Sequence, residues 1–233
     1  MNIYLFNSSL GKKFLMALTG AGLFAFVVGH LVGNLQVFLG PEAINRYGHF
    51  LQSNLEIIWP ARLGLLAFVI IHVWTAVTLS AENKAARPVE YAGAAVPPAA
   101  SYASRTMLMS GLIIAAFIIY HLLHYTVQVQ AINLTGQDFK ALHETLKDGT
   151  QRHDVYKMMV TGFSHPVVSL FYVVAMGLLC LHLSHGVSAM FQSLGLKNKA
   201  WDPAINCFTR GIAGVIFVGY ISIPIAVLPG LVK

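Results

Sequence analysis

The sequence predicts an all-α integral membrane bundle of five transmembrane helices. Of the 233 residues, 56% are hydrophobic and only 10% are charged, whereas soluble domains carry roughly 25% charged residues. A helix needs about 20 apolar residues to cross a bilayer. Five long stretches contain no Asp, Glu, Lys or Arg, namely 14–41, 63–81, 106–137, 158–196 and 211–232. We interpret the whole chain, 1–233, as a single membrane domain.

Charged residues, prolines and turn residues between these stretches set the expected helix ends. The sequence predicts helices near 13–38, 60–81, 103–129, 166–192 and 207–228. The first stretch follows Lys12 and Lys13, as the apolar part of a signal peptide would. Its roughly 25 residues exceed an ordinary signal-peptide core, however, and no small-residue cleavage site follows it. We therefore expect a membrane span there.

The distribution of Lys and Arg selects an orientation in the membrane. Five spans put the two termini on opposite sides, and with the N-terminus inside, eight Lys and Arg are inner and seven are outer. The long interval 130–157, long enough for an outer cap, holds four of those seven, and long loops count less in this rule. We expect a cytoplasmic N-terminus. The net charge of +6 is scattered over short loops, which fits membrane topology and a partner's docking surface better than nucleic acid.

Histidines are the informative residues. Ionisable side chains at membrane depth are costly and usually face a functional interior. One isolated histidine would be explained equally well by a hydrogen bond to a neighbouring helix, but several in four helices indicate a site. Six of the ten lie in the predicted spans: His30, His72, His121, His124, His182 and His185.

The first and third predicted helices share one pattern around a histidine. In each, a small hydroxyl residue and a glycine, Gly20 or Gly111, precede a histidine, His30 or His121, by ten positions. This spacing selects His121 rather than His124. His124 is three positions away, about one helical turn, and would be the ligand in another register.

The second and fourth predicted helices share a different spacing. Gly64 precedes His72, and Gly177 precedes His185, by eight positions. This spacing selects His185 rather than His182, which again lies about one turn away and would be the ligand in another register.

Helix direction explains why two spacings occur. The first and third helices run outward and the second and fourth run inward, so His30 and His121 are expected near the outer side, and His72 and His185 near the inner side. Ten residues rise about 15 Å and eight about 12 Å. Each helix therefore offers an imidazole at one level and a glycine at the other, where the backbone would permit close approach of a flat macrocycle. For any one glycine, ordinary small-residue packing is the better explanation, and the case for a haem depends on four glycines in register with four histidines.

These pairings predict two b-type haems, each held by two histidines. Zinc or copper fits less well, because no Asp, Glu or thiolate pairs stand beside the histidines to complete a compact shell. The two cysteines, Cys180 and Cys207, form no C-x-x-C or C-x-x-C-H pattern. An iron–sulfur ligand set and covalent haem attachment are therefore not expected.

The sequence resembles the di-haem cytochrome b membrane subunit of the succinate dehydrogenase and fumarate reductase family. The resemblance rests on V-V-G-H at His30, V-I-I-H-V-W-T-A at His72, M-S-G with a downstream Y-H at His121, and L-S-H-G-V-S-A-M-F at His185. It implies that these four histidines are the axial ligands, with the first and third helices on the outer haem. Some menaquinol-oxidising members carry a glutamate two positions before the last ligand, where Leu183 stands here.

The resemblance also implies partners and a location. A flavoprotein subunit would interconvert succinate and fumarate, and an iron–sulfur subunit would connect it to this chain in the bacterial cytoplasmic membrane. The chain alone would have no succinate activity, and would pass electrons to or from a membrane quinone, with menaquinone expected. We expect the partners at an inner surface that carries Lys12, Lys13, Lys84, Arg87, Lys197 and Lys199.

A polar group before the second helix is the expected quinone site. Asn54, Glu56, Trp59 and Arg62 cluster where a quinone head could enter, with Glu56 as the proton-transfer group. An interfacial anchor of Trp and Arg, with Glu56 paired to Arg62, is the alternative interpretation.

Two other functions fit the histidines. One is a cytochrome b subunit of another quinone-linked complex, of the hydrogenase or formate dehydrogenase type. The other is a haem-free transporter that uses histidines as a proton relay.

Overall fold

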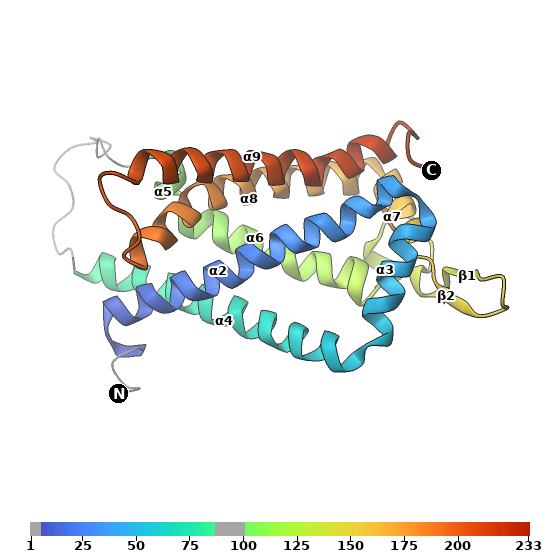
Figure 1. Ribbon diagram of the computed structural model, residues 1–233, viewed down its shortest axis with the longest axis horizontal. Helices are drawn as coiled ribbons and strands as arrows, with labels where there is room; N and C mark the ends of the chain where they lie inside the picture. The colour runs from blue at the N-terminus through green and yellow to red at the C-terminus, as the bar shows by residue number, and fades with distance from the viewer. Residues whose placement is uncertain (1–5, 87–100) are drawn as a thin grey trace. The chain divides into compact units, whose positions relative to one another are not determined.

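The computed structural model describes residues 6–86 and 101–233, and within them the chain is almost entirely helical (Figure 1). Five helices are long and apolar enough to cross a membrane, which confirms the predicted fold class of a multi-pass helical membrane protein. They are α2 (Ser9–Asn34), α4 (Leu55–Ala85), α6 (Met107–His121), α8 (Pro166–Ser193) and α9 (Asp202–Val227).

Shorter elements connect the five long helices. They are η1 (Leu35–Leu39), α3 (Pro41–Ser53), α5 (Tyr102–Arg105), the π-turn η2 (Leu122–Thr126), η3 (Gln130–Ile132), η4 (Phe139–Ala141), β1 (His143–Thr145), β2 (Gln151–His153) and α7 (Val155–Ser164). The 3-10 turn η1 continues the span of α2, and η2 continues that of α6.

Several helix ends differ from those expected, including the start of α9 at Asp202 rather than near residue 207. The second span begins at Leu55 rather than near residue 60, because the helix continues through Pro60 despite the missing N–H. The third span was expected over 103–129, but at its start the short helix α5 ends before Thr106. At its other end, α6 continues into a π-turn, in which the Val127 N–H donates to the Leu122 carbonyl at 2.8 Å.

The chain divides into two compact units, and every long helix contributes a segment to both. The first unit comprises 1–26, 64–115 and 179–214, and the second comprises 27–63, 116–178 and 215–233. Because both units are built from the same five helices, they are not successive domains along the sequence. The expectation of one membrane domain stays a prediction.

In the second unit, α3, the β1–β2 hairpin and α7 pack together as a cap (Figure 1). The buried side chain of Asn45 on α3 donates to Glu144 (2.9 Å) and Asp154 (3.0 Å) and accepts from the N–H of Tyr156 (2.7 Å). Asp154 also caps the N-terminus of α7. One buried amide thus ties α3 to the hairpin and to α7.

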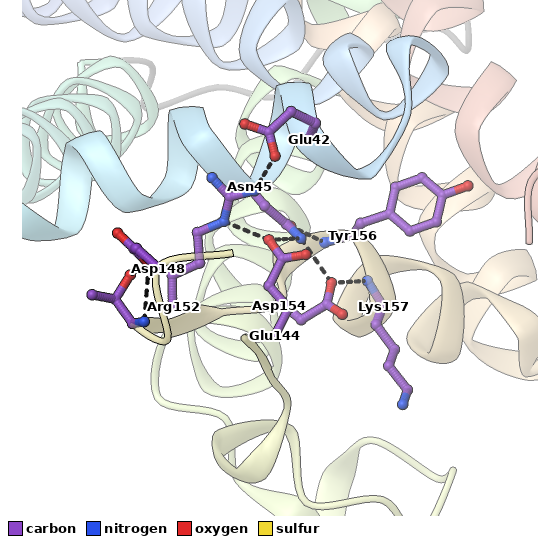
Figure 2. A network of polar contacts seen from close by, with 9 residues as sticks. Glu42, Asn45, Glu144, Asp148, Arg152, Asp154, Tyr156 and Lys157 are labelled. Carbon is purple, nitrogen blue, oxygen red and sulfur yellow. Dashed lines mark hydrogen bonds and ion pairs between the residues drawn. The ribbon is translucent and has the colours of Figure 1, made fainter. Parts of the chain in front are cut away.

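Arg152 completes this cap network. Figure 2 shows its guanidinium between Glu42 of α3 and Glu144 of β1, and it pairs with both. The hydrogen bond from Arg152 lowers the pKa of Glu42, and Glu42 in turn raises the pKa of Arg152. The interval 130–157 therefore forms an ordered cap rather than a loose loop.

In the first unit, two of the lysines expected on a docking surface are engaged within the chain. Lys12 is 3% exposed and pairs with Glu82, and Lys197 pairs with Asp202 at 2.6 Å. Burial of a charge at a partner-free position would be costly, and these carboxylates remove that cost. The exposed lysines of the expected set are Lys13, Lys84 and Lys199, while Arg87 lies outside the described residues.

Candidate functional site

The second unit holds a pair of facing histidines. His30 of α2 and His121, the last residue of α6, have ring centres 5.8 Å apart with ring planes at 82°. Phe117 stacks on His121 at 6.0 Å, and the ring of Tyr220 lies 6.3 Å from that of His30. The structure thus brings together the two histidines that the sequence paired at the outer level.

The first unit holds a second pair, formed by His72 of α4 and His182 of α8. Their ring centres lie 6.4 Å apart with planes at 67°. The partner selected from sequence, His185, makes no ring contact with His72 among the described residues. Three positions on a helix correspond to a rotation of about 300°, so His185 points about 60° away from His182. The geometry therefore favours His182 over the predicted His185.

Each histidine of the first-unit pair is held by a hydroxyl at its Nδ1 atom. Thr19 Oγ1 lies 3.2 Å from Nδ1 of His72, and Ser110 Oγ lies 3.3 Å from Nδ1 of His182. Both hydroxyls donate their own protons to carbonyls of their helix, Thr19 to Leu15 at 2.8 Å and Ser110 to Met107 at 3.2 Å. They therefore accept from the imidazoles, which places the ring proton on Nδ1.

Nδ1 of His72 also lies 3.2 Å from the carbonyl of Met16. Because a carbonyl can only accept, this contact independently assigns the proton to Nδ1. Among the described residues, Nε2 of His72 and Nε2 of His182 form no hydrogen bond. Nε2 is the atom left free to bind a metal.

Two of the four predicted glycines lie against this pair. A Cβ atom added to Gly20 or to Gly111 would lie 3.2 Å from Cε1 of His72 or of His182, respectively. The glycines thus make room for the imidazoles, and each follows the hydroxyl residue that holds the same ring. Gly64 has no atom within 4 Å of such a Cβ, and Gly177 has only Phe217 at 3.9 Å. Close approach of a haem to any of the four stays a prediction.

Both ring separations fit a metal ion held between two imidazoles. Two metal–nitrogen bonds of about 2 Å, with about 1 Å from each nitrogen to its ring centre, place the ring centres about 6 Å apart. The observed separations are 5.8 and 6.4 Å. No cluster of three or more His, Cys, Asp or Glu suited to a metal occurs in residues 6–86 and 101–233.

His121 has a neighbourhood that the sequence did not reveal. Its Nδ1 lies 3.2 Å from the hydroxyl of Tyr172, and the same hydroxyl lies 3.1 Å from Nδ1 of His124. His124 is fully buried. The only sequence signal was a tyrosine in the otherwise apolar start of the fourth helix.

Three of the expected quinone residues, Glu56, Trp59 and Arg62, lie on the first turns of α4 and are exposed, whereas Asn54 follows the end of α3 and is half-buried. The guanidinium of Arg62 lies 5.4 Å from the centre of the Trp59 ring. Glu56 forms no ion pair with Arg62 among the described residues, so the alternative of a Glu56–Arg62 pair is not what the structure contains. Within residues 6–86 and 101–233, the side chain of Glu56 forms no hydrogen bond or ion pair, and the quinone site stays a prediction.

Compared with known proteins, the chain matches no family model, no curated protein and no solved structure. Fold and site together define a class, a multi-pass helical membrane protein with two intramembrane histidine pairs.

Proposed function

We propose that this chain is the haem-bearing membrane subunit of a succinate:quinone oxidoreductase, with one haem b between His30 and His121 and another between His72 and His182. The observation that carries the proposal is the pair of facing imidazoles in each unit, with centres 5.8 and 6.4 Å apart. The sequence motifs around the histidines support the choice of family.

When bound, a haem would supply reversible one-electron transfer. The contribution of the chain is to hold the ligands. Thr19 and Ser110 keep the ring protons of His72 and His182 on Nδ1, so that each Nε2 can bind metal without first losing a proton. Hydrogen bonds of this kind also fix ring orientation and raise the basicity of a ligand. Gly20 and Gly111 let the Cε1 edges of the two rings approach the helix backbones closely.

Electrons would pass between an iron–sulfur subunit and a membrane quinone through these haems, while a flavoprotein subunit would handle succinate and fumarate. Menaquinone is the proposed quinone, and Glu56 on α4 the proposed proton-transfer group, because quinone chemistry needs a titratable group near the ring oxygen. The protein would lie in the bacterial cytoplasmic membrane with its N-terminus inside.

Single His→Ala substitutions test the ligand set in the purified complex. The reduced-minus-oxidised spectrum should show two b-type haems, and His72→Ala and His182→Ala should each abolish the same one. His185→Ala is the matched control, three positions from His182 on the same helix, and should retain both haems. Loss of that haem in His185→Ala, with retention in His182→Ala, would restore the sequence-based choice.

The same experiment separates the alternatives. A purified chain without any haem spectrum would contradict the proposal and leave the haem-free transporter. Two haems without a co-purifying flavoprotein that oxidises succinate would instead favour the hydrogenase or formate dehydrogenase type.

A further inference from the structure

The hydroxyl of Tyr172 contacts two imidazoles in the second unit. It lies 3.2 Å from Nδ1 of His121 and 3.1 Å from Nδ1 of His124. A phenol has one proton to donate and can accept another hydrogen bond. Among the described residues its proton has no acceptor other than these imidazoles, so the hydroxyl donates to one of them and accepts from the other.

Metal binding to His121 would decide which imidazole is the donor. A neutral imidazole that binds metal through Nε2 carries its proton on Nδ1. His121 then donates to Tyr172, and Tyr172 donates to Nδ1 of His124. The proton of His124 must lie on Nε2, a buried atom that has no partner among the described residues. The three groups form one directed chain from the ligand into the protein.

Aromatic packing holds the hydroxyl of Tyr172 in this position. The ring of Tyr172 is 7% exposed and stands edge-on to Phe117 and to Phe163, each with a centroid distance of 5.0 Å. His124 is 0% exposed and is placed by the π-turn that follows α6. Water cannot easily replace either partner, so the hydrogen bond to His121 depends on Tyr172.

We propose that Tyr172 is a positioning residue that sets the reduction potential of the haem held by His30 and His121. This inference rests on the proposed function. A ligand imidazole that donates from Nδ1 becomes more basic, which favours ferric over ferrous iron and lowers the potential. Hydrogen bonding around an axial ligand is one of the protein's levers on haem potential.

Tyr220 provides a matched control. It is a second, half-buried tyrosine beside the same pair, with its ring centre 6.3 Å from that of His30. Its hydroxyl donates to the carbonyl of Val27 at 2.8 Å rather than to His121. Replacing Tyr220 by Phe removes a hydroxyl of the same kind near the same site without touching the chain from His121 to His124.

The test is a redox titration of the assembled complex with wild-type chain, Tyr172→Phe and Tyr220→Phe. The haem of interest is the one that His30→Ala lacks. Tyr172→Phe should keep both haems, raise the midpoint potential of that haem and alter its low-spin electron paramagnetic resonance signal. Tyr220→Phe should leave the potential unchanged. Two retained haems with an unshifted potential in Tyr172→Phe would overturn the inference.

A second variant covers the case in which Tyr172→Phe loses the haem. His124→Leu leaves Tyr172 in place but removes its acceptor, which should weaken the bond to His121 and raise the potential by a smaller amount. An unchanged potential in His124→Leu, with both haems present, would then overturn the inference. Absence of haem from the wild-type complex would instead refute the proposed function, so the two failures are distinguishable.

Discussion

The adjacent residues Thr19 and Gly20 act on one imidazole in two ways. The hydroxyl accepts from Nδ1 of His72, and the missing Cβ of the glycine makes room for the Cε1 side of the same ring. Ser110 and Gly111 do the same for His182. A hydroxyl residue followed by glycine is therefore a cradle for a histidine on another helix, repeated once in the chain.

This cradle predicts an unusual outcome for Gly20→Ala. Alanine in place of a helical glycine ordinarily stabilises by up to about 1 kcal/mol. At Gly20 the new methyl would lie 3.2 Å from Cε1 of His72 and would push the ring from Thr19. We expect no gain in melting temperature. We also expect the haem bound by His72 to be held about 10-fold more weakly, because changing a group that orients a metal ligand typically weakens metal binding by about this factor.

Gly211→Ala on α9 of the same unit is the control, since a Cβ there meets no atom within 4 Å. It should keep full haem content and gain stability. Equal haem content in Gly20→Ala and Gly211→Ala, measured as the pyridine haemochrome, would show that the cradle does not matter.

The sequence and the structure pair His72 with different residues of the fourth span, His185 and His182, and helix packing explains the difference. The spacing from a glycine on the same helix selected His185, but the contact that distinguishes the two is made by Ser110 on α6. Apolar residues are distributed around all sides of helix α8, so its own periodicity does not reveal which face meets α6. The hydroxyl before Gly111 was visible in the sequence, but its partner depends on how the helices pack.

At the scale of elements, charge-free stretches were sufficient to predict five spans, because a membrane requires about 20 apolar residues per helix. Their ends were less predictable. The second helix was expected to start near residue 60, whereas α4 begins at Leu55. The π-turn Leu122–Thr126 inserts an extra residue per turn, and it helps to bring His124 to the hydroxyl of Tyr172. No local pattern in the apolar sequence signals that insertion.

The cap should loosen as the pH falls below neutrality, because of His153 on β2. Gln128 Nε2 lies 3.0 Å from Nε2 of His153 and donates to it, which requires that nitrogen to be unprotonated. Burial lowers the pKa of His153, and the neighbouring His143 adds to the effect, while the carbonyl of Leu142 and Asp154 oppose it. The folded cap therefore binds fewer protons than the unfolded chain between the lowered pKa and 6.5, so its stability falls as pH falls through this window.

Hydrogen exchange of the hairpin, corrected for intrinsic rates, measures this effect at pH values of about 7.5 and about 5.5, on either side of the usual histidine pKa. Protection should fall in the wild type and much less in His153→Gln. His49→Gln, an exposed position on α3, should behave as the wild type does. Protection that does not change with pH in the wild type would contradict the prediction. Glu42 does not interfere, because its pKa is lowered from a value already below this range.

At the scale of the whole molecule, the described part of the first unit has an excess of free positive charge. Its two acids, Glu82 and Asp202, pair with Lys12 and Lys197. The remaining cations are exposed and form no ion pair with a described residue: Lys13, Lys84, Arg105, Lys199 and Arg210. In the cap of the second unit, by contrast, Arg152 is neutralised by Glu42 and Glu144. An acidic partner surface would complement the first unit best.

This asymmetry yields a prediction about assembly. The variant reverses three exposed charges by combining Lys13→Glu, Lys84→Glu and Lys199→Glu. It should associate with the soluble subunits about 10-fold more slowly at low salt, because complementary charges at the edge of an interface accelerate the encounter of two proteins. The difference from wild type should shrink as salt screens these charges. Both haems should be retained, since none of the three lysines contacts a histidine of either pair. The control reverses Lys140, Lys147 and Lys157 of the second unit and should leave association unchanged.

The same surface must face the cytoplasm if the partners dock there, and Lys197 and Lys199 make that testable with trypsin. In intact cells the segment 193–203 should resist cleavage. In inverted vesicles freed of the soluble subunits, trypsin should cut it after Lys199. Lys199 is exposed, whereas the side chain of Lys197 is held by Asp202, Ser188 and Asn206. Cleavage after Lys199 from outside intact cells would reverse the orientation. It would also place the exposed cations of the first unit on the outer side, away from the proposed partners, and the triple charge reversal should then leave association unchanged.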